Sequence, residues 1–405
     1  MINRLFFVLI FLATLTGSGF AQSPARMSID DHSLEVVRAG SGPYTLIFES
    51  GFGTDYKVWG QVASEMAKEQ TVVLYSRAGT GQSDPVKDPG PERAVADLAG
   101  LVEKAGLRGP FILVGHSYGA FVIRGFAASH PDQVRGMVFV DPAHEQLMKE
   151  LARVSPEKAA RDQEIQQGFV PERFRVENEQ INRIFETGRL PDFGKLPDVP
   201  VMVLTSVQER PRPELFLHEP EGIAVWRQLH TRFFSQFSSG AHWVTPNSGH
   251  NIHREEPQLV AGAIRQVIRL ADQAKQRQEH ARKAGVLTAA LEQAAAVRNS
   301  RRAEELVSGG AKASGLAERD LNSIAYSCLN DPRLREPAVL LLKYNTLAYP
   351  ASANAFDSYG EGLLALGRTG PARAQFLKAI ELAEASHDEA TLRNSRMNLE
   401  KIKSP

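Results

Sequence analysis

Cysteine and net charge are both scarce in this sequence, and each shortage argues against a class of protein. Cys328 is the single cysteine among 405 residues, so no disulfide can form within the chain. The 47 basic and 47 acidic residues cancel, which argues against a nucleic-acid partner and against a strongly charged substrate. Because Cys328 falls at an apolar helical position, we expect a buried, unreactive thiol. The length still allows a large core and more than one domain.

Long apolar runs are also scarce, and the run at the start of the chain is short. Leu5 to Leu15 form this run, Arg4 precedes it, and Gly19-Phe20-Ala21 offers a small-x-small cleavage site. The pattern predicts a signal peptide over residues 1–21. Because the run is shorter than the roughly 20 residues of a membrane span, we expect an exported protein, periplasmic or secreted, with no stable span after cleavage. The alternative is an uncleaved membrane anchor.

The most informative stretch is residues 111–120. Four apolar residues predict a buried strand, a Gly-x-Ser-x-Gly turn follows at residues 115–119, and a helix is expected after Ala120. Such a turn holds its serine in a strained conformation, which neighbours without side chains make possible. We therefore interpret Ser117 as a nucleophile at the carboxyl end of a strand; the alternative is an ordinary turn serine.

Strands and helices alternate along residues 22–272, which predicts a mostly parallel sheet covered on both faces. Residues 26–38 are expected to form a hairpin at its edge. The expected strands are 44–49, 71–75, 111–114, 136–140, 199–204 and 241–245, and the expected helices are 58–68, 94–105, 222–237 and 257–270.

A helical, charged insertion interrupts this alternation at residues 143–198. It is too long for a simple crossover, so we interpret it as a cap over the site. Phe169, Phe174 and Phe185 are candidate walls of the pocket beneath it, although aromatic residues in a helical segment are more often core.

Three residues in the order Ser, Asp, His complete the pattern of nucleophilic catalysis: Ser117, Asp141 and His250. An imidazole takes the proton of the attacking hydroxyl, and a carboxylate fixes its tautomer. Asp141 follows the strand at 136–140 and is favoured as the acid, with Glu209 as the alternative. The alternative role for Asp141 is that of a conformational anchor before Pro142.

A glycine-rich loop at residues 50–54 follows the first parallel strand, where an oxyanion hole belongs. We expect the backbone N–H groups of Phe52 and Tyr118 to face the reacting carbonyl oxygen; the alternative is that the glycines merely make a tight turn. A second glycine-rich loop, residues 76–84, lacks the Lys-Ser/Thr of a phosphate loop. We interpret it as structural, with Arg77 paired to a carboxylate. His250 and His253 lie on a loop without a third ligand, which argues against a metal site.

With these motifs in place, residues 27–272 resemble the α/β-hydrolase superfamily. The motifs that carry the resemblance are Glu49-Ser50-Gly51-Phe52-Gly53, Tyr75-Ser76-Arg77-Ala78-Gly79-Thr80-Gly81-Gln82-Ser83, Gly115-His116-Ser117-Tyr118-Gly119 and Ser248-Gly249-His250. The resemblance implies a serine hydrolase with Ser117 as nucleophile and His250 as base. Two features depart from the usual pattern: Ser50 stands where members usually have histidine, and Asp141 lies one strand earlier than most triad acids.

Composition shifts at about residue 273 toward Ala, Gln, Arg and Glu. Residues 353–382 resemble a tetratricopeptide unit, a looser unit precedes them, and residues 284–307 are a degenerate candidate. We therefore expect a helical domain at 273–405 that either binds a partner protein or peptide or packs on itself, including as a dimer.

Together these patterns predict an exported two-domain serine hydrolase of the α/β class. It would cleave a carboxylic ester or related acyl bond of a small molecule, without metal or organic cofactor. The alternatives are an acyltransferase with the same triad and a non-catalytic scaffold whose helices bind a partner.

Overall fold

The computed structural model describes residues 23–403, so the predicted signal peptide lies outside the described residues. Contacts divide the chain into two compact units, one ending at Gln273 and the other beginning at Ala274. Among the described residues, no helix combines the length and apolar character that crossing a bilayer requires.

An eight-stranded sheet forms the centre of the first unit, in the order β1-β2-β4-β3-β5-β6-β7-β8. The edge strand β1 and its neighbour β2 form the predicted hairpin, and β2 pairs antiparallel with β4. All remaining pairs are parallel, which confirms the predicted fold class. The strands are β1 (Ala25–Ile29), β2 (His32–Ala39), β3 (Thr45–Glu49), β4 (Thr71–Ser76), β5 (Phe111–His116), β6 (Val134–Val140), β7 (Val201–Ser206) and β8 (Gly240–Thr245).

Helices cover both faces of this sheet because its central strands are apolar on both sides. Along β5, Phe111 and Leu113 face one core, whereas Ile112 and Val114 face the other. The first core is closed by α2, α3 and part of α7, and the second by η1, α1 and the start of α9. These helices are α1 (Gly60–Met66), α2 (Pro91–Lys104), α3 (Gly119–Ser129), α7 (Pro220–Phe234) and α9 (Pro257–Ala295), with η1 at Tyr56–Trp59.

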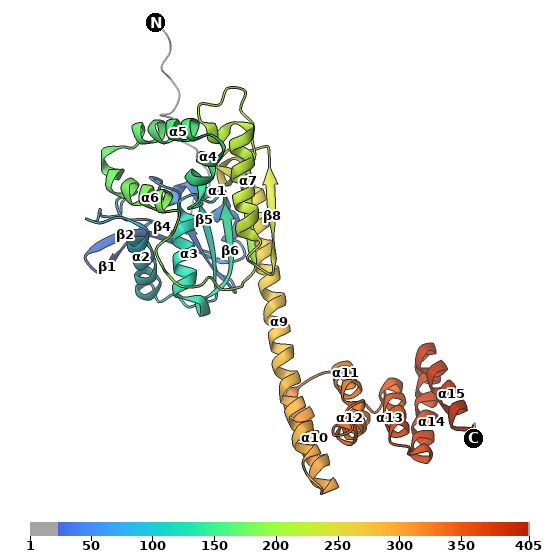
Figure 1. Cartoon of the computed structure of the whole chain (residues 1–405). Coiled ribbons are helices and arrows are strands. Elements are labelled where there is room, and N and C mark those ends of the chain that lie inside the picture. The colour runs from blue at the N-terminus through green and yellow to red at the C-terminus, as the bar shows by residue number, and fades with distance from the viewer. Residues whose placement is uncertain (1–22, 404–405) are drawn as a thin grey trace. The chain divides into compact units, whose positions relative to one another are not determined.

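Three helices lie between β6 and β7, within the insertion at residues 143–198 that we call the cap. They are α4 (Leu147–Val154), α5 (Pro156–Gly168) and α6 (Arg175–Thr187). Leu147, Leu151 and Ala159 of the cap pack on Trp226 and Leu229 of α7. Figure 1 shows the cap helices in green at the edge toward which the parallel strands point.

Helix α9 is much longer than predicted: it does not end at Leu270 but continues to Ala295. The prediction was wrong because residues 271–284 contain neither glycine nor proline and are rich in strong helix formers. Most of this segment is exposed.

Helices alone form the second unit, as the fold prediction requires. They follow α9 as α10 (Ser300–Ser314), α11 (Glu318–Leu329), α12 (Arg335–Ala348), α13 (Ala353–Ala365), α14 (Thr369–Ser386) and α15 (Glu389–Lys403). A Cβ at Gly360 of α13 would lie 2.6 Å from Cε1 of Phe376 in α14, so these helices are in close contact. The Cys328 thiol is buried, as expected. The tetratricopeptide resemblance stays a prediction.

Candidate active site

Ser117 sits in a sharp turn between β5 and α3. Its φ of +52° lies in the left-handed region, which a non-glycine residue rarely adopts. A Cβ at Gly115 would lie 2.8 Å from Ile123 Cδ1, and one at Gly119 would lie 2.6 Å from Glu49 O. Both glycines are therefore needed for the turn, which has the strained geometry expected from the sequence.

Asp141 follows β6 directly, in a second strained position with φ of +42°. Its carboxylate is buried and accepts three hydrogen bonds. Oδ1 accepts from the backbone N of Ser206 at 2.9 Å and from Nε1 of Trp226 at 2.8 Å, while Oδ2 bonds with Nδ1 of His250 at 2.7 Å. The alternative acid, Glu209, is exposed.

His250 lies on the loop between β8 and α8 (Ile252–Glu255). Its backbone oxygen accepts from Nε2 of His116 at 2.9 Å, and the preceding Gly249 N donates to Glu255 Oε2 at 2.9 Å. The His116 and His250 rings lie 4.6 Å apart. Burial holds the pKa of His116 well below its usual 6.5, so this ring is neutral and supports the loop from beneath the turn.

One pocket of about 460 Å³ brings together Ser117, Asp141 and His250. Phe52 and Tyr118, the two residues predicted as oxyanion donors, also line this pocket. Within residues 23–403, neither of their N–H groups donates a backbone hydrogen bond. Ser117 and His250 share the pocket without a hydrogen bond to each other; such catalytic bonds commonly tighten only in the substrate complex.

Apolar side chains from both the sheet domain and the cap line the pocket, and several cap amides line it as well. The apolar lining includes Phe121, Leu147, Ile181, Phe185, Leu217 and Trp226. Three half-buried amides, Gln163, Asn178 and Asn182, also line it. Sequence reasoning missed these amides, although residues 178, 181, 182 and 185 follow helical spacing on one face of α6.

The three phenylalanines predicted as walls have different positions. Phe185 lines the pocket, and Phe174 packs edge-on against Phe52 with ring centroids 5.6 Å apart. Phe169 is 63% exposed, so its prediction as a pocket wall was wrong. It follows Gly168 at the end of α5, where the chain turns out of the helix.

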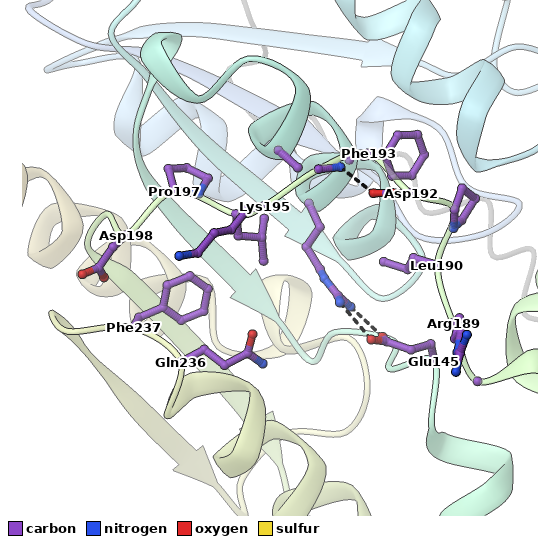
Figure 2. A pocket seen from close by; sticks show the side chains of 17 residues that line it. Glu145, Arg189, Leu190, Asp192, Phe193, Lys195, Pro197, Asp198, Gln236 and Phe237 are labelled. Atoms are coloured by element: carbon purple, nitrogen blue, oxygen red, sulfur yellow. Dashed lines mark hydrogen bonds and ion pairs between the residues drawn. The ribbon is translucent and has the colours of Figure 1, made fainter.

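A second, larger pocket of about 930 Å³ lies elsewhere in the first unit (Figure 2). Residues 188–198 line much of it, together with Arg124 and Glu145, and none of the predicted site residues does. Arg124 donates to both oxygens of Glu145, at 2.7 and 2.9 Å. Burial raises the pKa of Glu145, but hydrogen bonding to Arg124 outweighs it and brings the value to about 2. The two charges therefore neutralise each other.

The described residues do not form a metal site. No group of three or more His, Cys, Asp or Glu side chains there is arranged to hold a metal ion. His253, which the sequence spacing pairs with His250, packs instead against His116 and Trp59 with tilted rings, at centroid distances of 4.3 and 4.6 Å.

Comparison with known proteins shows which sequences this chain resembles. The chain is 29% identical over 240 residues to "Uncharacterized protein YqjL" of Bacillus subtilis, covering 56% of this chain and 84% of that protein. It is 33% identical over 111 residues to "Lipase LipV" of Mycobacterium tuberculosis, covering 27% of this chain and 42% of that protein.

Solved structures similar to this chain include a thermophilic esterase from Thermogutta terrifontis. It is 21% identical, with a TM-score of 0.41, covering 62% of this chain and 99% of that one. Alpha/beta hydrolase domain-containing protein 10 from mouse is 17% identical, with a TM-score of 0.46, covering 61% and 98%. The sequence profile of the Alpha/beta hydrolase family matches residues 46–263, more than half of the chain, and the chain therefore belongs to this family.

Proposed function

We propose that this protein hydrolyses a carboxylic ester or a related acyl bond through an acyl intermediate on Ser117. The observation that supports this most strongly is the 2.7 Å hydrogen bond between His250 Nδ1 and Asp141 Oδ2 in the pocket that Ser117 lines. This bond places the imidazole proton on Nδ1 and leaves Nε2 able to accept one.

In the proposed reaction, Nε2 of His250 takes the proton of Ser117 as its Oγ attacks the carbonyl carbon. The negative charge on the carbonyl oxygen is stabilised by the N–H groups of Phe52 and Tyr118. His250 then protonates the departing alcohol, and the acyl group remains on Ser117. Water, activated by the same imidazole, attacks the acyl-enzyme and releases the acid.

The pocket lining favours an uncharged substrate with an apolar part. Aromatic and aliphatic side chains from both the sheet domain and the cap line the pocket, and the charged residues Arg210 and Glu255 that also line it have opposite signs. The cap amides can hydrogen-bond to hydroxyl or carbonyl groups without favouring a charge. An ester that combines an apolar part with polar, uncharged groups fits this lining.

Labelling with a fluorophosphonate, followed by intact-mass analysis, tests the proposal. We expect one equivalent on the wild type, none on Ser117→Ala, and full labelling of Ser129→Ala, a matched serine on α3. A folded wild type that takes up no label would instead support the non-catalytic scaffold. Product analysis with added alcohols distinguishes hydrolysis from acyl transfer.

We further propose that the protein is exported, on the strength of the sequence pattern at residues 1–21. Amino-terminal sequencing of the periplasmic or secreted form should give Gln22 as the first residue. For the helical unit we propose contact with a partner protein or peptide, or with a second copy of the chain. Sedimentation of the purified protein, alone and in cell extract, distinguishes the two.

A further inference from the structure

A buried arginine lies directly behind the candidate oxyanion loop. Arg77 follows β4, and its side chain is 4% exposed. Nη1 donates to Glu49 Oε1 at 2.6 Å and to the backbone oxygen of Ser50, and Nη2 donates to the backbone oxygen of Gly51 at 2.9 Å. Arg77 therefore binds two successive carbonyls of the loop that precedes Phe52.

The bond to Gly51 O acts on the proposed oxyanion donor through a single peptide group. The carbonyl of Gly51 and the N–H of Phe52 belong to one planar trans peptide, so they point in opposite directions. A guanidinium that holds the carbonyl end fixes the direction of the N–H end, away from Arg77. The positive charge at the carbonyl also polarises the peptide and makes its N–H a stronger donor.

The second proposed donor belongs to a residue that Arg77 also contacts. The guanidinium carbon of Arg77 lies 4.8 Å from the ring centroid of Tyr118, a cation–π contact. Tyr118 is 2% exposed, so its ring is confined next to this cation. A single side chain thus contacts the peptide group that carries one proposed donor, through Gly51 O, and the ring of Tyr118, the residue that carries the other.

The cap supplies the second carboxylate of this cluster. Glu177 of α6 places Oε1 3.6 Å from Nε of Arg77, and its side chain is 7% exposed. Burial raises the pKa of Glu177 and of Glu49, while Arg77 opposes that rise in both. The hydroxyl of Tyr75 also donates to Glu49. The next cap residue, Asn178, lines the pocket.

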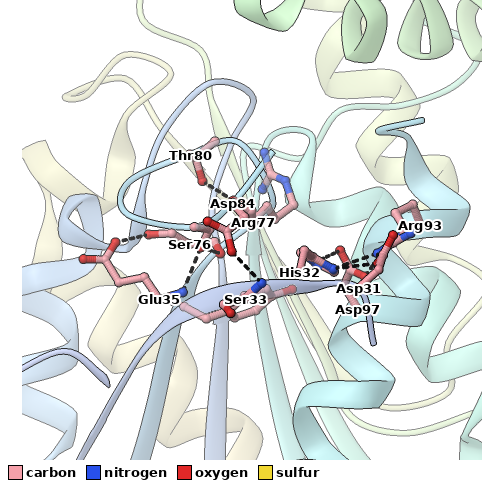
Figure 3. Close-up of polar contacts among 12 residues, drawn as sticks. Asp31, His32, Ser33, Glu35, Ser76, Arg77, Thr80, Asp84, Arg93 and Asp97 are labelled. Atoms are coloured by element: carbon pink, nitrogen blue, oxygen red, sulfur yellow. Dashed lines mark hydrogen bonds and ion pairs between the residues drawn. The ribbon is translucent and has the colours of Figure 1, made fainter. Parts of the chain in front are cut away.

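The backbone that carries Arg77 is fixed independently of the cap (Figure 3). Thr80 Oγ1 donates to Arg77 O at 2.8 Å, and Ser83 Oγ donates to Ser76 O at 2.6 Å. Glu35 Oε2 accepts from Ser76 Oγ at 2.9 Å. Neutralising Glu177 should therefore affect the Arg77 side chain more than its loop.

We infer that Arg77 is a positioning residue for the oxyanion hole, and that Glu177 couples this function to the seating of the cap. The inference rests on the proposed function. Loss of one oxyanion donor costs roughly 100- to 1,000-fold in kcat. Misplacing the donor through Arg77 should cost part of that, about 10- to 100-fold, with KM little changed.

The test compares three variants by kcat and KM on p-nitrophenyl acetate and by thermal unfolding. Arg77→Met alone leaves both Glu49 and Glu177 buried without their cation. It is therefore combined with Glu49→Gln, which removes the carboxylate closer to Arg77, and thermal unfolding measures the cost of the one that remains. We expect this double variant to lose about 10- to 100-fold in kcat. Glu177→Gln should lose about 3- to 10-fold, and Glu179→Gln, an exposed neighbour on α6, should match the wild type.

A second measurement separates positioning from general loosening. Sulfur accepts hydrogen bonds weakly, so an oxyanion hole favours an ester over the matching thionoester, in which a C=S group replaces the carbonyl C=O. This preference should shrink in the double variant and in Glu177→Gln. Equal losses on both substrates, losses confined to KM, or folded variants with wild-type kcat would overturn the inference. Failure of the wild type to take up fluorophosphonate would instead refute the proposed function.

Discussion

Replacing Asp141 by asparagine tests the link between the buried carboxylate and the proposed base. Oδ1 accepts from the N–H groups of Ser206 and Trp226, and Oδ2 bonds with His250 Nδ1. Because two donors converge on Oδ1, the amide oxygen of asparagine keeps that position and its NH₂ faces His250. An NH₂ group only donates, so Nδ1 must become an acceptor and the ring proton moves to Nε2.

The magnitude follows from this change of tautomer. An Nε2 that already carries a proton cannot take one from Ser117, so we expect kcat to fall on the order of 10⁴-fold. The bonds to Ser206 and Trp226 persist, so the free energy of unfolding should change by only about 1 kcal/mol. Asp141→Ala should instead destabilise the fold, because each orphaned buried donor costs about 1–3 kcal/mol.

Turnover of p-nitrophenyl acetate and urea unfolding measure the two effects separately. Glu209→Gln is the matched control and should keep wild-type kcat, since Glu209 is exposed. The reasoning is refuted if Asp141→Asn keeps more than a tenth of wild-type kcat in folded protein, or if Glu209→Gln loses as much.

Two further predictions concern stability. Burial lowers the pKa of His253 to about 3 and of His230 to about 4, below the usual 6.5, so the unfolded chain binds more protons in mild acid. The free energy of unfolding should therefore fall as the pH drops from 6.5 toward 4, by about 1.3 kcal/mol for each histidine between pH 7.5 and 5.5. Urea unfolding at pH 7.5 and 5.5 checks this, and equal unfolding midpoints would contradict it. Gly360→Ala would push a Cβ against Phe376 and should destabilise the helical unit by about 1–3 kcal/mol. Gly370→Ala, which faces open space, should be neutral or stabilising, and thermal unfolding followed by circular dichroism compares them.

Much of the site follows from local sequence because Ser117 and Asp141 come directly after strands and His250 lies on the loop after another. The glycines around Ser117 specify the turn, and Asp141 and His250 follow strands whose carboxyl ends share one edge of a parallel sheet. The choice between Asp141 and Glu209 as the triad acid was harder to make from the sequence. Asp141 and Glu209 follow neighbouring strands, and only the folded loop shows that the carboxylate of Asp141 is the one bonded to His250.

Features that depend on contacts between distant segments were beyond sequence reasoning. The interpretation of residues 76–84 as a structural loop pairs Arg77 with a carboxylate, and Glu49 fits that prediction. The second carboxylate, Glu177, comes from a cap helix one hundred positions further on, and no local pattern indicates it. Phe169 shows the converse error, since an apolar residue at a helix end has no periodic partners to fix its direction.

The register of the central strands has a consequence for refolding. His116 is paired with Val140 and Val140 with Leu204. The hydrogen-bonded register of the strands therefore sets the distances between the residues that follow them. A slip of one residue between β5 and β6 would displace Asp141 by about 3.3 Å and turn alternate side chains to the opposite face. Molecules with such a slip would be inactive even if they stayed compact. The specific activity after refolding would therefore measure the fraction of chains whose strands have paired in the native register.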